Sequence, residues 1–391
     1  MQPMISAVRA IAVGAAMAVA VPAGAADLPK ATQKMLSALK LDASILSGLD
    51  KELAVPQAWV DAAKKEKEVI IYTSTRPKAW AKMHGILKER YPYINFRHEE
   101  TNTAERRWLR PLAAYTQGRI ITDVVMDTSG NIYKFREAGA VIPLNDLPGY
   151  NNFPAEVRQK DDIIVAVRSR YWCMSYNTKK VKKSDLPKTW DDLLTNPLFA
   201  NKNLALLNRS NLWLLNVWAD KGSDWGKQFT RDLFTKTSPQ LRKEGLNAGI
   251  TLVSIGEANA AIPSAMMRVG PEEKKGAPVA FHCPEPVPYT ISDMAIMNKS
   301  PRTNAAKIFV NWYLSKEGQI AQYWGNYSPP SHKELLRKEF LFYPEAVAGK
   351  KIAPLNDRAE EMAKEVVEEW NKYWLAAGGP VPKKKKKKAA Q

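Results

Sequence analysis

Short apolar runs alternate with stretches of helical periodicity in the first third of this chain. Three runs rich in β-branched and apolar residues are predicted strands: 68–72, 94–98 and 123–126. Between the first two, Trp80, Met83 and Leu87 recur at helical spacing, and residues 104–117 form a second helical stretch. A strand-helix-strand-helix-strand order with short connections predicts a parallel sheet with right-handed crossovers. The sequence therefore indicates an open α/β fold.

The loops after the first and third predicted strands are candidate binding loops, because ligands of open parallel sheets bind beyond the carboxyl ends of the strands. The first loop offers the hydroxyls of Thr73, Ser74 and Thr75. Its Arg76 can hold a carboxylate or phosphate with two parallel hydrogen bonds. A helix starting near Pro77 would add the positive end of its dipole. The alternative interpretation is an ordinary helix cap beside a solvated arginine.

The length of the chain, 391 residues, exceeds the size at which a single hydrophobic core stops growing, so we expect two lobes. The middle third repeats the α/β alternation, with predicted strands at 172–176, 204–207 and 260–262 and predicted helices at 211–219 and 239–254. Two further helices are predicted at 305–314 and 357–374. In the last one, residues four apart form one apolar stripe: Met362, Val366, Trp370 and Trp374.

The amino-terminal end differs from this α/β pattern. Residues 1–25 are a predicted signal peptide, with Arg9 before an apolar run that is too short to span a bilayer comfortably, and with small residues at 23–25 for cleavage. An uncleaved helical anchor is the alternative. Residues 26–67 are a predicted extension of two or three short amphipathic helices.

The chain is strongly basic, with 58 Lys and Arg against 40 Asp and Glu and a net charge of +18. Removing the seven charges of Arg9 and of the lysines at 383–388 from that +18 still leaves +11. Such a field favours anionic partners. The six consecutive lysines belong to residues 377–391, which we predict to be a disordered tail because like charges repel one another.

Cys173 and Cys283 are the two cysteines of the sequence. In an exported protein they have two possible fates, a disulfide or two buried thiols. A disulfide would close a loop of 110 residues, counted from 173 to 283.

Three blocks of sequence carry a family resemblance: 186–194 (LPKTWDDLL), 256–257 followed by 276–279 (GE and GAPV), and 305–319 (AAKIFVNWYLSKEGQ). Together they resemble the periplasmic solute-binding proteins of ABC importers, in the group that includes the ferric-ion carriers. The resemblance runs from residue 68 to about 343. It implies a type II periplasmic-binding fold whose lobes are each a mostly parallel sheet flanked by helices. It divides the chain into a discontinuous first lobe, 68–171 with 287–376, and a second lobe, 172–286.

The resemblance also implies where a ferric carrier would hold its metal. Its ligands are a histidine after the first strand, an acidic residue after the third, and two adjacent tyrosines in the second lobe. At those places this chain has Arg76, Thr128, Met266 and Met267, and a register shift of one would put Asp127 in the acidic position. Fe(III) prefers anionic oxygen ligands, which these side chains lack. We therefore expect neither a bare ferric ion nor a cofactor.

We predict instead a small anionic organic solute, a carboxylate, phosphate or phosphonate, bound between the lobes. The candidate ligand-binding residues are Thr73, Ser74, Thr75, Arg76, Asp127, Thr128, Tyr171, Tyr176, Arg209, Asn211, Ser264, Met266 and Tyr289. For the aromatic residues and Met266, burial in a core is the competing interpretation.

The predicted role is that of a monomeric periplasmic protein that presents its solute to an ABC permease in the inner membrane and binds no nucleic acid. The sequence has no His-Glu-x-x-His, Gly-x-Ser-x-Gly, P-loop or Gly-x-Gly-x-x-Gly motif, so we do not predict an enzyme. Three alternatives stay open: a ferric-complex binder of the same family, a solute sensor for a signalling receptor, and an exported hydrolase or transferase on this fold.

Overall fold

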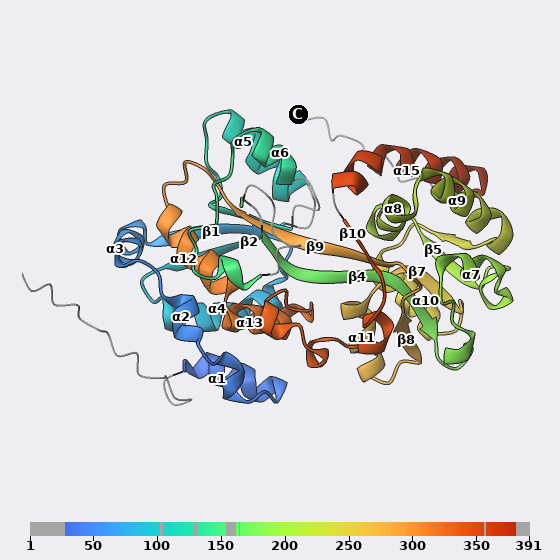
Figure 1. Ribbon diagram of the computed structural model, residues 1–391, viewed down its shortest axis with the longest axis horizontal. Coiled ribbons are helices and arrows are strands. Elements are labelled where there is room, and N and C mark those ends of the chain that lie inside the picture. Colours follow the sequence, from blue (N-terminus) through green and yellow to red (C-terminus); the bar gives the residue numbers. More distant parts are fainter. Residues whose placement is uncertain are drawn as a thin grey trace, which may run out of the picture.

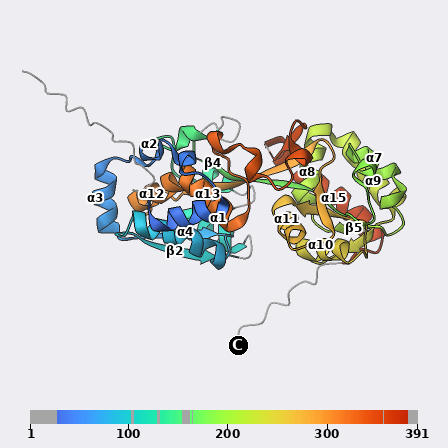
Figure 2. The same ribbon diagram turned by 90° about the horizontal axis from the view of Figure 1, so that it is seen from below.

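The structure, a computed structural model, describes residues 28–101, 105–127, 132–153, 162–163, 165–355 and 357–380. The predicted signal peptide and the run of lysines lie outside these residues. Two lobes stand side by side along the long axis (Figures 1 and 2), and each encloses its own large hydrophobic core. Within the described part of the chain, no helix is both long and apolar enough for a membrane span.

The first lobe contains the predicted parallel sheet, in the order β2-β1-β3. Its elements are β1 (Glu68–Thr73), α4 (Pro77–Arg90), β2 (Asn95–Glu100), α5 (Arg110–Thr116), β3 (Val124–Met126) and α6 (Ile132–Glu137). Three consecutive residues from Val69 are buried, as expected for a parallel strand covered on both faces. Because β1 and β3 are parallel neighbours, with Tyr72 opposite Val125, the loops that follow them lie at the same edge of the sheet.

The amino-terminal extension packs against the first lobe. It consists of α1 (Lys30–Leu39), a 3₁₀ turn (Ala43–Leu46), α2 (Leu49–Leu53) and α3 (Gln57–Glu66). Leu36 and Leu46 are buried in the first core. Helices α1 and α3 contact α4 and α12 (Thr303–Leu314), which is followed by α13 (Lys316–Asn326). The extension therefore covers the helical face of the lobe.

The second lobe is a sheet in the order β4-β7-β5-β6, with β8 beside β4. Its elements are α7 (Trp190–Thr195), β5 (Leu204–Leu207), α8 (Ser210–Lys221), α9 (Ser223–Thr237), β6 (Gln240–Arg242), α10 (Leu246–Ser254), β7 (Ala260–Ala265), α11 (Met266–Lys274) and β8 (Val279–His282). The helix predicted at 239–254 is wrong in its first part. Gln240 pairs with Ala205 as an edge strand, and the helix begins only after Gly245.

Two long antiparallel strands connect the lobes: β4 (Val165–Asn177) and β9 (Val287–Ile296). The first half of β4 pairs with β9, and its second half pairs with β7 and β8 of the second lobe. The change of partner falls at Tyr171 and Trp172. The structure joins Cys173 of β4 to Cys283, after β8, in a disulfide on the second-lobe side. Of the two possible fates of the cysteines, the structure has the disulfide.

The carboxy-terminal segment corrects the predicted lobe boundaries. After α13 the chain crosses to the second lobe, where it forms α14 (Pro344–Val347), β10 (Ile352–Pro354) and α15 (Asp357–Ala376). The prediction that 287–376 stays in the first lobe is therefore wrong for α15, which packs on α8 and α9 (Figure 1). Of the apolar stripe, Val366, Trp370 and Trp374 are buried and Met362 is half-buried. Trp370 packs against Trp213 and Phe234. A stripe shows that a face is buried but not which lobe covers it.

The first residues of the predicted tail, 377–380, are ordered against the second lobe, which corrects the boundary predicted at 377. Residues 377–380 form a turn on the end of α15, where the Gly379 amide donates to the Trp374 carbonyl at 2.8 Å. The Trp374 indole lies within reach of the Pro380 carbonyl, at 3.3 Å. Residues 381–391 lie outside the described part of the chain.

Candidate functional site

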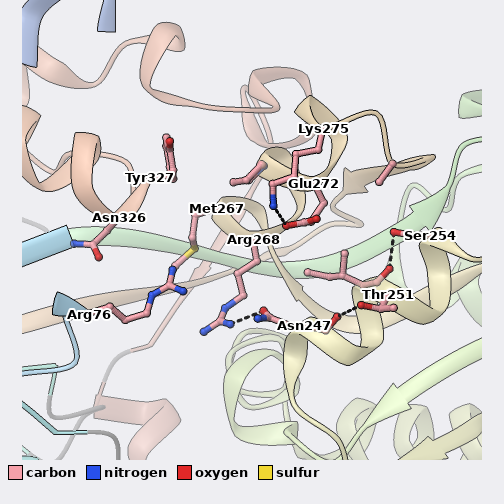
Figure 3. A pocket seen from close by; sticks show the side chains of 13 residues that line it. Arg76, Asn247, Thr251, Ser254, Met267, Arg268, Glu272, Lys275, Asn326 and Tyr327 are labelled. Atoms are coloured by element: carbon pink, nitrogen blue, oxygen red, sulfur yellow. Dashed lines mark hydrogen bonds and ion pairs between the residues drawn. The ribbon is translucent and has the colours of Figure 1, made fainter. Parts of the chain in front are cut away.

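Two adjoining cavities of about 560 and 370 Å³ lie between the lobes. Both are lined by Arg76, Met267, Arg268 and Asn326, so they form one continuous cleft. The first lobe contributes the loop after β1 and the end of α13, and the second lobe contributes α10 and α11 (Figure 3). The sequence had nominated the β1 loop, and the structure places it at this cleft.

Asp127 organises the first-lobe wall. Its carboxylate accepts hydrogen bonds from the Ser74 amide at 3.0 Å, the Ser74 hydroxyl at 2.7 Å and the Thr73 hydroxyl at 3.0 Å. The residue has a φ of 59°, a left-handed conformation that Asp tolerates better than most residues. Thr73 and Thr75 are buried and bond to each other, whereas Ser74 lines the smaller cavity. Two of the three predicted hydroxyls therefore support the loop, and the third lies in the cleft.

Arg76 lies at the amino-terminal cap of α4, directly before Pro77. Its side chain is exposed and lines both cavities. It points across the cleft toward Met267 and Arg268 (Figure 3). Among the described residues it has no hydrogen-bond or ion-pair partner. The guanidinium is consequently free to bind a ligand.

Three arginines that the sequence analysis did not select line the smaller cavity: Arg107, Arg168 and Arg170. Arg168 and Arg170 lie two apart on β4, so they share one face of the strand. Both reach the Asp127 carboxylate, Arg168 in a close buried pair and Arg170 at 3.4 Å. The Arg-x-Arg spacing inside a crossing strand is the signal that would have found them.

Arg107 reaches the same place from a π-helical turn, Glu105–Leu109. Its Nε donates to the Asp127 carbonyl at 3.0 Å, and its Nη1 donates to the Thr101 carbonyl at 2.6 Å. These acceptors are neutral, so the charge of Arg107 is not cancelled by them.

The pKa values in this cluster reflect burial opposed by ion pairing. Burial alone would raise the pKa of Asp127, but Arg168, Arg170 and the Ser74 hydrogen bond outweigh it and hold that pKa well below its usual range. Burial, and then the neighbouring Arg168, lower the pKa of Arg170 to about 10. Arg170 therefore remains charged at neutral pH.

The second-lobe wall is formed by α11, from Met267 to Glu272, and by one face of α10. Arg268 donates from Nη1 to the Asn247 side chain at 2.7 Å. Burial, and then Arg76 opposite, lower the pKa of Arg268. The larger cavity continues past a Lys275–Glu272 pair at 2.8 Å and along the α10 face formed by Ile250, Thr251 and Ser254.

Several predicted site residues line neither cavity. Tyr176, Ser264 and Met266 are buried in the second core, where the Ser264 hydroxyl lies 2.9 Å from that of Ser175. Arg209 and Asn211 lie at the start of α8 and are exposed.

Tyr171 and Tyr289 contact each other where β4 and β9 cross, with ring centroids 5.4 Å apart. Thr128 lies outside the described residues. Met267, expected at a ferric-ligand position, does line the cleft.

Within the part of the chain that the structure describes, no group of three or more His, Cys, Asp or Glu side chains is placed to hold a metal ion. The cleft instead brings together guanidinium groups, amides and hydroxyls. Such groups donate hydrogen bonds, so the arrangement is suited to oxyanion ligands.

Residues 116–320 match the family model described as bacterial extracellular solute-binding protein. This match covers more than half of the chain, which therefore belongs to the bacterial extracellular solute-binding proteins. The family implies capture of a small solute, and its members are binding proteins, not enzymes. The comparison with curated proteins gave no significant match.

Solved structures with the same fold support the two-lobed type II periplasmic-binding architecture. Iron-bound HitA from Pseudomonas aeruginosa superposes with a TM-score of 0.64 at 17% identity, covering 78% of this chain and 99% of that one. A Trichodesmium protein, IdiA or FutA, in complex with iron and citrate gives 0.63 at 16% identity, with coverages of 78% and 99%. A putative extracellular solute-binding protein from Bordetella parapertussis gives 0.65 at 13%, with coverages of 79% and 99%.

Proposed function

We propose that this protein captures a small anionic organic solute between its lobes in the periplasm and delivers it to an ABC permease. The observation that carries the proposal is the set of guanidinium groups that line the cleft: Arg76, Arg107, Arg168, Arg170 and Arg268. A carboxylate, phosphate or phosphonate can accept paired hydrogen bonds from such groups.

Closure of the lobes would couple solute binding to transport. The solute contacts the first lobe through Ser74 and Arg76 and the second lobe through Arg268 and Asn247, so the closed form gains contacts that the open form lacks. The solute then shifts the population toward the closed form by its difference in affinity for the two states. Binding therefore creates the paired lobe surfaces that a permease would recognise.

A ferric complex of an organic acid is the second candidate, favoured by the structural neighbour whose ligands are iron and citrate. In that case the arginines would contact the acid, and the acid would supply the oxygen ligands for the metal. Thermal-shift measurements with citrate, with ferric citrate and with a panel of phosphoesters and phosphonates separate the two candidates. Stabilisation only by the ferric complex would favour the second.

Arg76→Ala is expected to weaken the binding of an anionic solute by at least ~1.5 kcal/mol, which is the lower end of the range for a hydrogen bond to a charged group. Isothermal titration with the solute found in the panel measures this loss. Arg209→Ala is the matched control, since Arg209 is an exposed arginine outside both cavities. Equal affinity of the Arg76 variant and the wild type would remove Arg76 from the site.

A further inference from the structure

We propose that the solute carries two separate anionic groups and that it bridges two seats, one on the first lobe and one between Arg76 and Arg268. This inference rests on the proposed function and narrows its substrate class. The first seat consists of Arg107 and Arg170. A dicarboxylate or a phosphorylated carboxylic acid has the required chemistry.

The cleft has an excess of two positive charges, which a solute with two negative charges would balance. The five arginines of the cleft face three carboxylates: Asp127, Glu100 at the wall of the smaller cavity, and the buried Asp293, which acts on Arg107 and Arg168. Five against three leaves two positive charges. In the larger cavity Lys275 and Glu272 cancel each other. For the described residues that line the cleft, counted together with Asp127 and Asp293 behind its wall, a solute with two negative charges therefore brings the balance to neutrality.

The first seat follows from the donors that remain available on the first lobe. Arg168 already donates hydrogen bonds to the Ser292 hydroxyl at 3.1 Å, to the Ser74 hydroxyl at 3.3 Å and to the Asp127 carboxylate. Among the residues that the structure describes, Arg170 reaches Asp127 alone, at 3.4 Å, and its Nε has no hydrogen-bond partner. A buried donor without a partner is costly unless a ligand satisfies it. Arg170, together with Arg107, whose hydrogen bonds go to backbone carbonyls, is thus the place for one acidic group.

The second seat lies where the two cavities meet. Arg76 from the first lobe and Arg268 from the second line both cavities, and their side chains approach each other across the cleft (Figure 3). An anion held only at the first seat leaves these like charges facing each other as the lobes close. A second acidic group between them replaces that repulsion with two attractions, one on each lobe. Closure is therefore strongest for a solute with two separated charges.

Two matched pairs of probes test the inference by isothermal titration: glutarate against its monomethyl ester, and 3-phosphoglycerate against glycerol 3-phosphate. In each pair the first member carries two anionic groups and the second carries one. At least one pair should show a preference of tenfold or more for the two-group member. In Arg268→Gln this preference should fall to within about twofold, while affinity for the one-group member changes little, because a single group occupies the first seat.

Arg209→Gln is the control variant and should keep the full preference. Small-angle X-ray scattering supplies a second readout, in which only two-group probes compact the wild-type protein. Equal affinity within both pairs overturns this inference and leaves the proposed function standing. Failure of all four probes to bind, together with failure of the wider anion panel, overturns both. A preference that survives in Arg268→Gln also overturns the bridging geometry.

Discussion

Both lobes have clustered aromatic rings in their cores, but they differ in the other contacts that stabilise them. The first lobe contains buried ion networks: Asp127 with Arg168, and Glu317 with Arg90, Thr32 and Trp312. The second contains a disulfide and a cluster of tryptophan and phenylalanine rings around Trp213 and Trp370. Ion networks respond to pH, whereas a disulfide responds to redox conditions. The lobe that carries most of the arginines of the cleft is therefore also the acid-sensitive one.

The largest expected effect is loss of the disulfide by the double substitution Cys173→Ser and Cys283→Ser. The loop closed by the bridge spans 110 residues, so on the chain-entropy model its removal costs ~4 to 5 kcal/mol. Urea unfolding, followed by tryptophan fluorescence, measures the change. The contrast between the lobes would be contradicted if the loss in unfolding free energy were below ~1 kcal/mol. It would also be contradicted if that loss changed with pH between 4 and 7.

Asp127→Ala should destabilise the first lobe by ~3 to 5 kcal/mol, because it leaves Arg168 buried without its counter-ion. Unfolding by urea at pH 7 tests this value. Asp146→Ala is the control, since its pair with Lys307 is half exposed and such pairs contribute ~0 to 1 kcal/mol. Similar losses in the two variants would show that the buried network is not what stabilises this lobe.

Acid should lower the free energy of unfolding of the first lobe progressively as the pH falls. The pKa of Asp127 is lower in the folded protein than in the unfolded chain, so its contribution is fully present above the unfolded pKa near 3.8 and is lost as pH falls below it. The expected slope is about 1.4 kcal/mol for each pH unit below about pH 4. The difference in unfolding free energy between wild type and Asp127→Asn, measured from pH 7 to pH 2, should shrink only below pH 4. A constant difference would contradict the ion-pair explanation.

Local patterns predicted much of the fold. The strand-helix alternation from 68 to 126 predicted the parallel order of β1 and β3, and that order placed Ser74 and Arg76 at the cleft. The aromatic candidates were harder to predict. The ring of Tyr176 could stack on a ligand, but this residue is buried in the second core. The side chains of a strand alternate between two faces, and both faces are covered here.

The sequence by itself determined the α/β class, the two-lobed size, the loop that carries Ser74 and Arg76, and the buried face of α15. The two lobes follow from the length of the chain, and the other features depend on periodicity or spacing within a few residues of one another. Only the tertiary structure decided that α15 covers the second lobe, and that Arg107, Arg168 and Arg170 converge on Asp127. The contacts to Asp127 join residues 20 to 43 positions apart. The contacts of α15 join segments between which the chain passes through the first lobe and returns to the second. Such partners depend on the path of the whole chain, which no local pattern encodes.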